Sequence, residues 1–313
     1  MIPSQRDVQQ AFDRVRPHVH QTPVLTSRLL DELSGASIFF KCENFQKMGA
    51  FKMRGAINAI LQIPQADQAK GVVTHSSGNF AQAVSLAAKN LGIPAYIVMP
   101  NNAPQVKKDA VVSYGGIIYE SKATIAAREA MASQIQNKTG ATFLHPSNHI
   151  DVILGQGTAA IELLQEQPSL NCIITPVGGG GLLAGSALAA KYYGSSIGVY
   201  AGEPFNADDG YRSLQSGKIE YNTTVNTIAD GLRTHLGDKN FPIIKTLVTD
   251  IIRVEEQEII SAMKLLWERL KIIIEPSCAV PFAALLKDKK TFAGKKVGII
   301  LSGGNVDLTN LPF

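Results

Sequence analysis

The sequence predicts an α/β protein with two lobes, each an open, mostly parallel, twisted sheet flanked by helices. Short β-branched runs alternate with longer segments of helical periodicity, which is typical of parallel strands joined by crossover helices. Most of these runs are apolar throughout, as expected for strands that are covered on both faces. The length of 313 residues is about twice that of a typical domain, so two lobes are expected.

The individual elements follow from these patterns in chain order. Strands are predicted at residues 71–75, 94–99, 116–119, 172–177, 197–202, 251–254 and 297–301. Helical periodicity covers residues 81–90, 123–138, 182–193 and 255–271. Because the sequence has no Pro/Ser-rich linker, residues 71–148 are interpreted as a small domain inserted into a large domain made of residues 1–70 and 149–313.

The composition excludes several classes of protein. Apolar residues make up 45% and charged residues 18%, so the chain is not intrinsically disordered. The net charge of +4 is spread without a basic run, which argues against nucleic acid as a partner. The uncharged stretch 171–190 contains Pro176 and four glycines, which argue against a membrane span. Three distant cysteines and a start without an apolar leader predict a cytoplasmic protein without disulfides.

A run of four glycines, in Pro176-Val-Gly-Gly-Gly-Gly-Leu-Leu-Ala184, carries the strongest local signal. It follows a predicted strand and opens a predicted helix, so backbone N–H groups and the helix dipole can converge on a phosphate. The same loop matches the dinucleotide fingerprint Gly179-x-Gly181-x-x-Ala184, with Glu203 about 20 residues further on. A nicotinamide-dependent dehydrogenase that uses residues 179–184 is therefore an alternative.

Three further segments argue against a dehydrogenase. Ser76-Ser-Gly-Asn-Phe80 and Ser302-Gly-Gly-Asn-Val306 each follow a predicted strand, at the sheet edge where open α/β sheets bind ligands. Lys52 lies in Gly49-Ala-Phe-Lys-Met-Arg-Gly55, among glycines and an aromatic residue rather than on a charged face. A hydride-transfer enzyme needs no such lysine, whereas covalent amine chemistry does.

Together these motifs resemble the pyridoxal-phosphate enzymes of the tryptophan-synthase-β fold type, and among them the serine racemase and serine/threonine dehydratase branch. The resemblance runs from about Thr22 to Leu308. The motifs Phe51-Lys-Met-Arg-Gly-Ala, Ser76-Ser-Gly-Asn, the four glycines, Glu275-Pro-Ser and Ser302-Gly-Gly-Asn-Val-Asp occur in the family's order. The resemblance implies pyridoxal 5'-phosphate in the cleft between the lobes, a small amino-acid substrate and a homodimer.

The resemblance also implies roles for the cofactor-binding residues. Lys52 forms the Schiff base with the cofactor, Phe51 packs on its ring, Asn79 bonds its phenolic oxygen and Ser302 faces its pyridine nitrogen. The residues that hold its phosphate are Gly178, Gly179, Gly180 and Gly181. A neutral hydroxyl at the pyridine nitrogen favours elimination over transamination, because the ring is then a weaker electron sink.

The implied reaction is the dehydration and deamination of L-serine or L-threonine to a 2-oxo acid and ammonia. An alternative substrate within the same family is 3-hydroxyaspartate. The residues implied to surround the substrate carboxylate are Ser76, Ser77, Asn79 and Arg128. Racemases of this branch have a serine at the position of Ser77, where it can protonate the carbanion on the face opposite the lysine. Serine racemase activity is therefore also expected. The alternative is that the Ser77 hydroxyl only stabilises a turn.

A divalent cation is expected in the loop Glu203-Pro-Phe-Asn-Ala207-Asp-Asp209. Two carboxylates and a backbone carbonyl supply the hard oxygen ligands that suit Mg²⁺ or Ca²⁺. The arrangement resembles the cation site of the racemase branch, with Glu203, Ala207 and Asp209 as ligands. Solvated acidic side chains are the alternative for these residues.

Two positions depart from the family pattern. Phe80 stands where the family usually has histidine, and Ser147 stands where the racemase branch tends to have asparagine. Both are expected near the substrate, so they bear on substrate preference rather than on cofactor binding.

Overall fold

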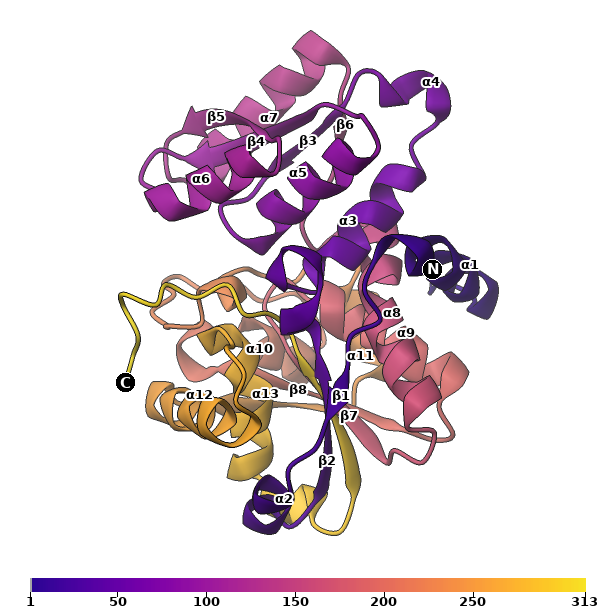
Figure 1. The fold of residues 1–313 in the computed structure, drawn as a ribbon, viewed down its shortest axis with the longest axis vertical. Helices are drawn as coiled ribbons and strands as arrows, with labels where there is room; N and C mark the ends of the chain where they lie inside the picture. The colour runs from indigo at the N-terminus through magenta and orange to yellow at the C-terminus, as the bar shows by residue number, and fades with distance from the viewer. Residues whose placement is uncertain (1) are drawn as a thin grey trace.

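The computed structural model describes residues 2–313 and divides them between two sheets, which lie in separate lobes (Figure 1). The smaller sheet has the order β5-β4-β3-β6, and all of its strands are parallel. Its strands are β3 (Val72–His75), β4 (Ala95–Pro100), β5 (Ile117–Ser121) and β6 (Thr142–Phe143). Its helices are α5 (Asn79–Asn90), α6 (Gln105–Ser113) and α7 (Ile125–Thr139).

Helices cover both faces of the small sheet, which explains its continuously apolar strands. Val72 packs in one cluster with Val84 of α5, whereas its neighbour Val73 packs in another with Ala132 and Ile135 of α7. Successive side chains of a strand point to opposite faces, so both must be apolar here.

The larger sheet has the order β1-β2-β10-β7-β8-β9, and only β1 is antiparallel to its neighbour. Its strands are β1 (Val24–Leu25), β2 (Ser37–Cys42), β7 (Cys172–Pro176), β8 (Gly198–Pro204), β9 (Asp250–Val254) and β10 (Lys296–Leu301). One face packs against α1 (Gln5–Val15), α8 (Ile150–Glu166), α9 (Gly181–Tyr193) and α11 (Phe241–Leu247). The other packs against α2 (Arg28–Ser34), α12 (Glu256–Leu270) and α13 (Pro276–Lys287).

The remaining helices are short or lie between these layers. They are α3 (Lys52–Leu61), α4 (Gln65–Gln68), α10 (Asp209–Ser216) and α14 (Lys289–Phe292), together with the 3₁₀ turns η1 (Arg16–His18), η2 (Glu43–Phe45), η3 (Lys47–Gly49), η4 (Phe205–Ala207) and η5 (Asp230–Leu232). Figure 1 shows α3 at the junction of the two lobes. Its Met53 and Ile57 share a core with Phe80 of the small lobe.

The α/β class and every predicted strand are confirmed, but three strands were missed: β1, β2 and β6. The strands of the small sheet all fall between residues 72 and 143. The proposed domain boundaries, 1–70 and 149–313 around 71–148, remain a prediction.

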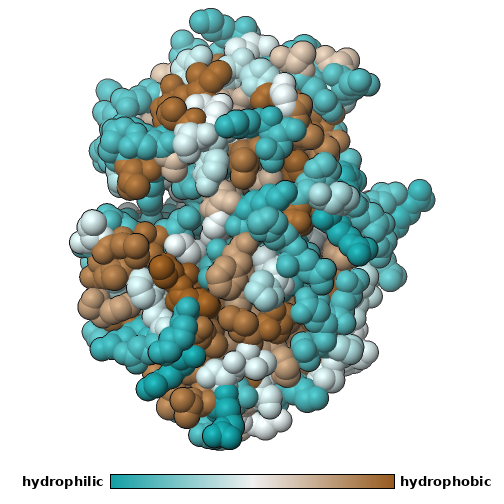
Figure 2. All heavy atoms as spheres, viewed as in Figure 1, coloured by the Kyte–Doolittle hydropathy of each residue, from teal (hydrophilic) through white to brown (hydrophobic). Residues whose placement is uncertain are grey.

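The surface in view is mixed in character. Figure 2 shows polar and apolar side chains interspersed over both lobes. Within residues 2–313, no helix combines the length and the hydropathy that a membrane crossing needs.

Candidate active site

Lys52 is the first residue of α3, and the structure places it where the two lobes meet. The preceding residue, Phe51, is buried and donates its backbone N–H to the Ser302 carbonyl at 3.0 Å, which ties the start of α3 to the end of β10. The Lys52 Nζ atom donates to the Pro146 carbonyl at 3.0 Å and lies 5.0 Å from the centre of the Phe51 ring. Burial lowers the pKa of this amine from 10.5 to about 8, while the Glu275 carboxylate acts in the opposite direction.

The four glycines join β7 to α9 and form a loop that leaves no room for side chains. A Cβ on Gly178 would lie 2.7 Å from the Leu232 Cα atom, and one on Gly179 would lie 2.3 Å from the Ser147 hydroxyl. Gly180 has a φ of 79°, in the left-handed region, and Gly181 begins α9. The first turn of a helix leaves backbone N–H groups unpaired, so this loop fits a phosphate group.

The loop after β3 contains Ser76 and Ser77 and leads to Asn79, which lies at the same junction. Asn79 is the first residue of α5, and its amide donates to both carboxylate oxygens of Glu275, at 3.0 and 3.1 Å. The Asn305 amide donates to the Asn79 Oδ1 atom at 2.9 Å. These bonds connect the small lobe to the ends of α13 and β10 in the large lobe.

Glu275 is a site residue to which the sequence analysis gave no role, although its Glu-Pro-Ser motif was noted. It lies directly before α13 and is only 5% exposed. Burial raises the pKa of its carboxyl group from 4.5 to about 7, and the charge of Asp230 raises it further, whereas the bond from Asn79 lowers it. This carboxylate is therefore poised to titrate near neutral pH beside Lys52.

Arg128 lies on α7, in the small lobe, and is the predicted site residue with the weakest connection to the others. Its charge helps to lower the pKa of His75, which directly precedes Ser76, although burial is the larger cause. Its Nε atom is buried and finds no hydrogen-bond partner among residues 2–313. The guanidinium group is therefore available to an anionic ligand near the loop 76–79.

The predicted cation ligands follow one another in the chain, with Glu203 at the end of β8, Ala207 at the end of η4 and Asp209 at the start of α10. Glu203 is fully buried and accepts backbone N–H groups from Gly210 and Tyr211 at 2.9 and 2.7 Å. Asp209 accepts the Asn222 amide at 2.8 Å. Burial raises the pKa of both carboxyl groups, that of Asp209 to about 7, and each carboxylate lacks a paired cation in the described chain. Within residues 2–313, no group of three or more His, Cys, Asp or Glu side chains that could hold a metal ion is found, so the cation at Glu203, Ala207 and Asp209 remains a prediction.

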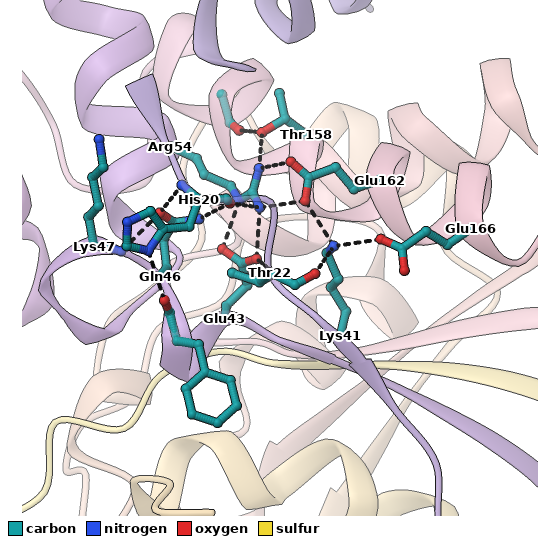
Figure 3. A network of polar contacts seen from close by, with 12 residues as sticks. His20, Thr22, Lys41, Glu43, Gln46, Lys47, Arg54, Thr158, Glu162 and Glu166 are labelled. Carbon is teal, nitrogen blue, oxygen red and sulfur yellow. Dashed lines mark hydrogen bonds and ion pairs between the residues drawn. The ribbon is translucent and has the colours of Figure 1, made fainter. Parts of the chain in front are cut away.

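A buried ion cluster anchors α3 through the Arg54 side chain (Figure 3). The Arg54 guanidinium pairs with both oxygens of Glu43, at 2.7 and 2.9 Å, and with both oxygens of Glu162, at 2.8 Å each. It also donates to the Thr158 hydroxyl at 3.2 Å. Lys41 joins the cluster through Glu162 at 2.8 Å. Because Arg54 and Lys52 are two residues apart on one helix, they point in nearly opposite directions.

The two departures from the family pattern also lie at the junction. Phe80 is 2% exposed, and its ring centre is 5.7 Å from the Lys52 Nζ atom. Ser147 is buried beneath the glycine loop, where its carbonyl accepts the Asn240 amide at 3.2 Å. Ser147 therefore contacts the loop assigned to the phosphate, which the sequence analysis did not foresee.

A lysine beside a glycine loop, between two α/β lobes with mostly parallel sheets, is the arrangement of the tryptophan-synthase-β fold type of cofactor-dependent enzymes. The family model described as "Pyridoxal-phosphate dependent enzyme" matches residues 15–303, and the chain belongs to this family. The family assignment also decides against the nicotinamide-dependent dehydrogenase.

Individual relatives are similar over almost the whole chain. A beta-hydroxyaspartate dehydratase of Paracoccus denitrificans is 47% identical, with 100% of this chain and 99% of that protein covered. A serine racemase of Dictyostelium discoideum is 50% identical, with 98% and 96% covered. The structure of maize serine racemase superposes with a TM-score of 0.97 at 48% identity, covering 99% of this chain and 95% of the other.

Proposed function

We propose that this enzyme dehydrates and deaminates a β-hydroxy amino acid, L-serine or L-threonine, to a 2-oxo acid and ammonia, and that it also racemises serine. The observation that carries the proposal is the position of the Lys52 amine at the junction of the lobes, near a glycine loop shaped for an anion. Burial lowers the pKa of this amine to about 8. Such an amine is partly unprotonated near neutral pH, so it can react with an aldehyde and can accept a proton. The serine racemase relatives support the substrate class.

Each residue then has a defined task. When bound, pyridoxal phosphate supplies an electron sink for the charge that develops at the substrate Cα atom. The glycine loop holds its phosphate, and Lys52 removes the Cα proton from one face of the substrate. Ser77 donates a proton on the other face, which gives the D-enantiomer. The start of α5 and the Arg128 guanidinium hold the substrate carboxylate.

The same geometry supports 3-hydroxyaspartate as a second candidate substrate. The buried Arg128 Nε atom has no partner within residues 2–313, and with this substrate it can pair with the second carboxylate while the start of α5 holds the first. The beta-hydroxyaspartate dehydratase relative supports this candidate as well.

The experiment compares the three substrates on one preparation loaded with pyridoxal phosphate. Release of 2-oxo acid is measured beside chiral chromatography of the remaining serine. Lys52→Ala is expected to stop both reactions, whereas Ser77→Ala is expected to stop formation of D-serine and to leave pyruvate release substantially intact. A protein without the yellow absorption band of lysine-bound cofactor would contradict the proposal, and a wild type that makes pyruvate but no D-serine would restrict it to dehydration.

We also propose a structural divalent cation, Mg²⁺ or Ca²⁺, at Glu203, Ala207 and Asp209. The burial of both carboxylates supports it. A homodimer is proposed from the family resemblance, and sedimentation at several concentrations tests it. A cytoplasmic location is proposed because all three cysteines are free and buried, as in a reducing compartment.

A further inference from the structure

The short segment from His145 to Asn148 contacts both Lys52 and the glycine loop. The Pro146 carbonyl accepts the Lys52 ammonium at 3.0 Å. One residue later, Ser147 lies against the glycine loop, and the Asn240 amide bridges the carbonyls of Ser147 and Gly179, at 3.2 and 2.8 Å. The position of this segment therefore affects the positions of the Lys52 amine and of the glycine loop.

The backbone N–H groups of this segment bond to a histidine side chain rather than to other backbone atoms. Among residues 2–313, neither Ser147 nor Asn148 donates its N–H to a backbone carbonyl, and Pro146 has no N–H to donate. Instead, the His145 Nδ1 atom accepts the N–H of Ser147 at 3.2 Å and the N–H of Asn148 at 2.9 Å. One ring nitrogen thus closes the turn around Pro146.

This contact requires a neutral imidazole with its proton on the Nε2 atom, because Nδ1 can accept only when it is unprotonated. Burial lowers the pKa of His145 to about 4. The groups that act on it from neighbouring elements are His75, Lys52 and His149, which lower the pKa further, and Asp238, which raises it. The ring also packs edge-on against His75, with centroids 5.8 Å apart.

We propose that His145 is a positioning residue. Its Nδ1 atom holds the turn that presents the Pro146 carbonyl to Lys52 and places Ser147 against the glycine loop. The proposal rests on the assignment of Lys52 as the reactive amine. A carbonyl at this position accepts a hydrogen bond from the ammonium, which favours the charged form of Lys52 over the neutral one. Loosening the turn should therefore favour the neutral amine and weaken the hold on the phosphate.

Two substitutions at His145 separate the role of Nδ1 from that of the ring. In His145→Asn, the Oδ1 atom takes the place of Nδ1 and the turn is retained. In His145→Gln, the acceptor moves out to the position of Nε2 and the turn is lost. The matched control is His149→Gln, because the His149 Nδ1 atom accepts the N–H of Asp151 at 3.2 Å at the start of α8, which is the same kind of contact without a link to Lys52.

Three readouts are taken on enzyme loaded with pyridoxal phosphate: the dissociation constant of the cofactor by absorbance, the pH profile of kcat and the melting temperature. His145→Gln is expected to raise the dissociation constant about tenfold, as the loss of two hydrogen bonds suggests, and to move the acid limb of kcat to lower pH. His145→Asn is expected to keep the dissociation constant and the acid limb of kcat close to those of the wild type. His149→Gln is expected to change only the melting temperature.

Other outcomes overturn the proposal. If His145→Gln binds the cofactor as the wild type does and has the same acid limb, the contact is only structural, however much the melting temperature falls. If the variant does not fold, the ¹⁵N chemical shifts of the His145 ring in the unmutated enzyme decide, because a proton on Nδ1 at neutral pH excludes the proposed contact. Loss of the yellow band in Lys52→Ala tests the proposed function independently.

Discussion

The Nζ atom of Lys107 in α6 lies 2.5 Å from the Asp230 carboxylate in η5, so an ion pair joins the small lobe to the large lobe. Asp230 acts in turn on Glu275, and it raises the pKa of that carboxyl group. The pair therefore lies beside the residues that connect Asn79 with Lys52. Such a contact stabilises the arrangement in which the two lobes are close together.

We predict that Lys107→Ala raises the KM for the amino-acid substrate by less than about fivefold. The partners are 31% and 44% exposed, and ion pairs of this kind contribute ~1 kcal/mol or less. Salt should raise the KM of the wild type and leave that of the variant unchanged, because salt screens the pair. Lys108→Ala is the matched control, since Lys108 pairs with Glu120 inside the small lobe at 2.6 Å. Equal salt dependence in all three proteins would exclude a role for the pair in closing the site.

The buried ion cluster leads to a prediction about stability. Glu162→Gln keeps the shape of the side chain but leaves Arg54 and Lys41 with one anion fewer, and breaking a buried pair costs about 3–5 kcal/mol. Glu162 is 5% exposed, so water cannot replace the lost charge. Urea unfolding measures the change. Glu32→Gln is the control, because its pair with Arg28 lies on the surface, and a change within about 0.5 kcal/mol is expected there.

The same cluster shows why one central strand escaped the sequence analysis. β2 lies between β1 and β10 in the large sheet, yet its sequence Ser-Ile-Phe-Phe-Lys-Cys carries a lysine that interrupts the apolar pattern. Lys41 is fully buried because Glu162 neutralises it from α8. Local sequence cannot reveal this partner, since it is contributed by a distant helix.

The active site could be predicted only in part for a similar reason. Lys52 and the four glycines stand in contiguous motifs, and the structure brings them together with Ser302 and Asn79. Glu275 and Pro146 act through partners that are 196 and 94 residues away in the chain. Pro146 contributes only a backbone carbonyl, which leaves no signature in the sequence.

Glu275→Gln should change the dependence of stability on pH. The folded-state pKa of Glu275 is raised from 4.5 to about 7, so the folded protein binds this proton more tightly than the unfolded chain does. Its contribution to stability is therefore present below pH 4.5 and is lost as the pH rises to about 7. As the pH rises from 4.5 to about 7, the melting temperature of Glu275→Gln should therefore fall less than that of the wild type.

Glu275→Gln should also shift the pH dependence of kcat. The Glu275 charge raises the pKa of Lys52, so its removal should lower that pKa below about 8 and shift the acid limb of kcat to lower pH. Asp307→Asn, which alters an exposed carboxylate in the segment after β10, is expected to leave both profiles unchanged. Identical acid limbs in wild type and Glu275→Gln would show that the two groups do not interact.

Removal of divalent cations should destabilise the protein. A cation that binds only the folded state adds ~2.7 kcal/mol at a hundredfold excess over its dissociation constant. We expect the melting temperature to rise with Mg²⁺ or Ca²⁺ relative to chelator, and Asp209→Asn to abolish the response. Asp208→Asn is the matched control, because Arg212 and Arg253 already hold Asp208, at 2.8 and 2.9 Å. A wild type that melts at the same temperature in chelator and in cation has no such site.

The last prediction concerns Phe80, whose ring lies 5.7 Å from the Lys52 Nζ atom. Phenylalanine carries no polar atom, so it cannot donate a hydrogen bond to a substrate carboxylate as an imidazole can. Phe80→His is therefore expected to lower the KM for serine, and the melting temperature should fall because a polar ring replaces a buried apolar one that is 2% exposed. Phe80→Leu separates the two effects, since it removes the ring without adding a donor and should not lower the KM. Equal Michaelis constants for serine in the wild type and Phe80→His would place this residue outside the substrate's contacts.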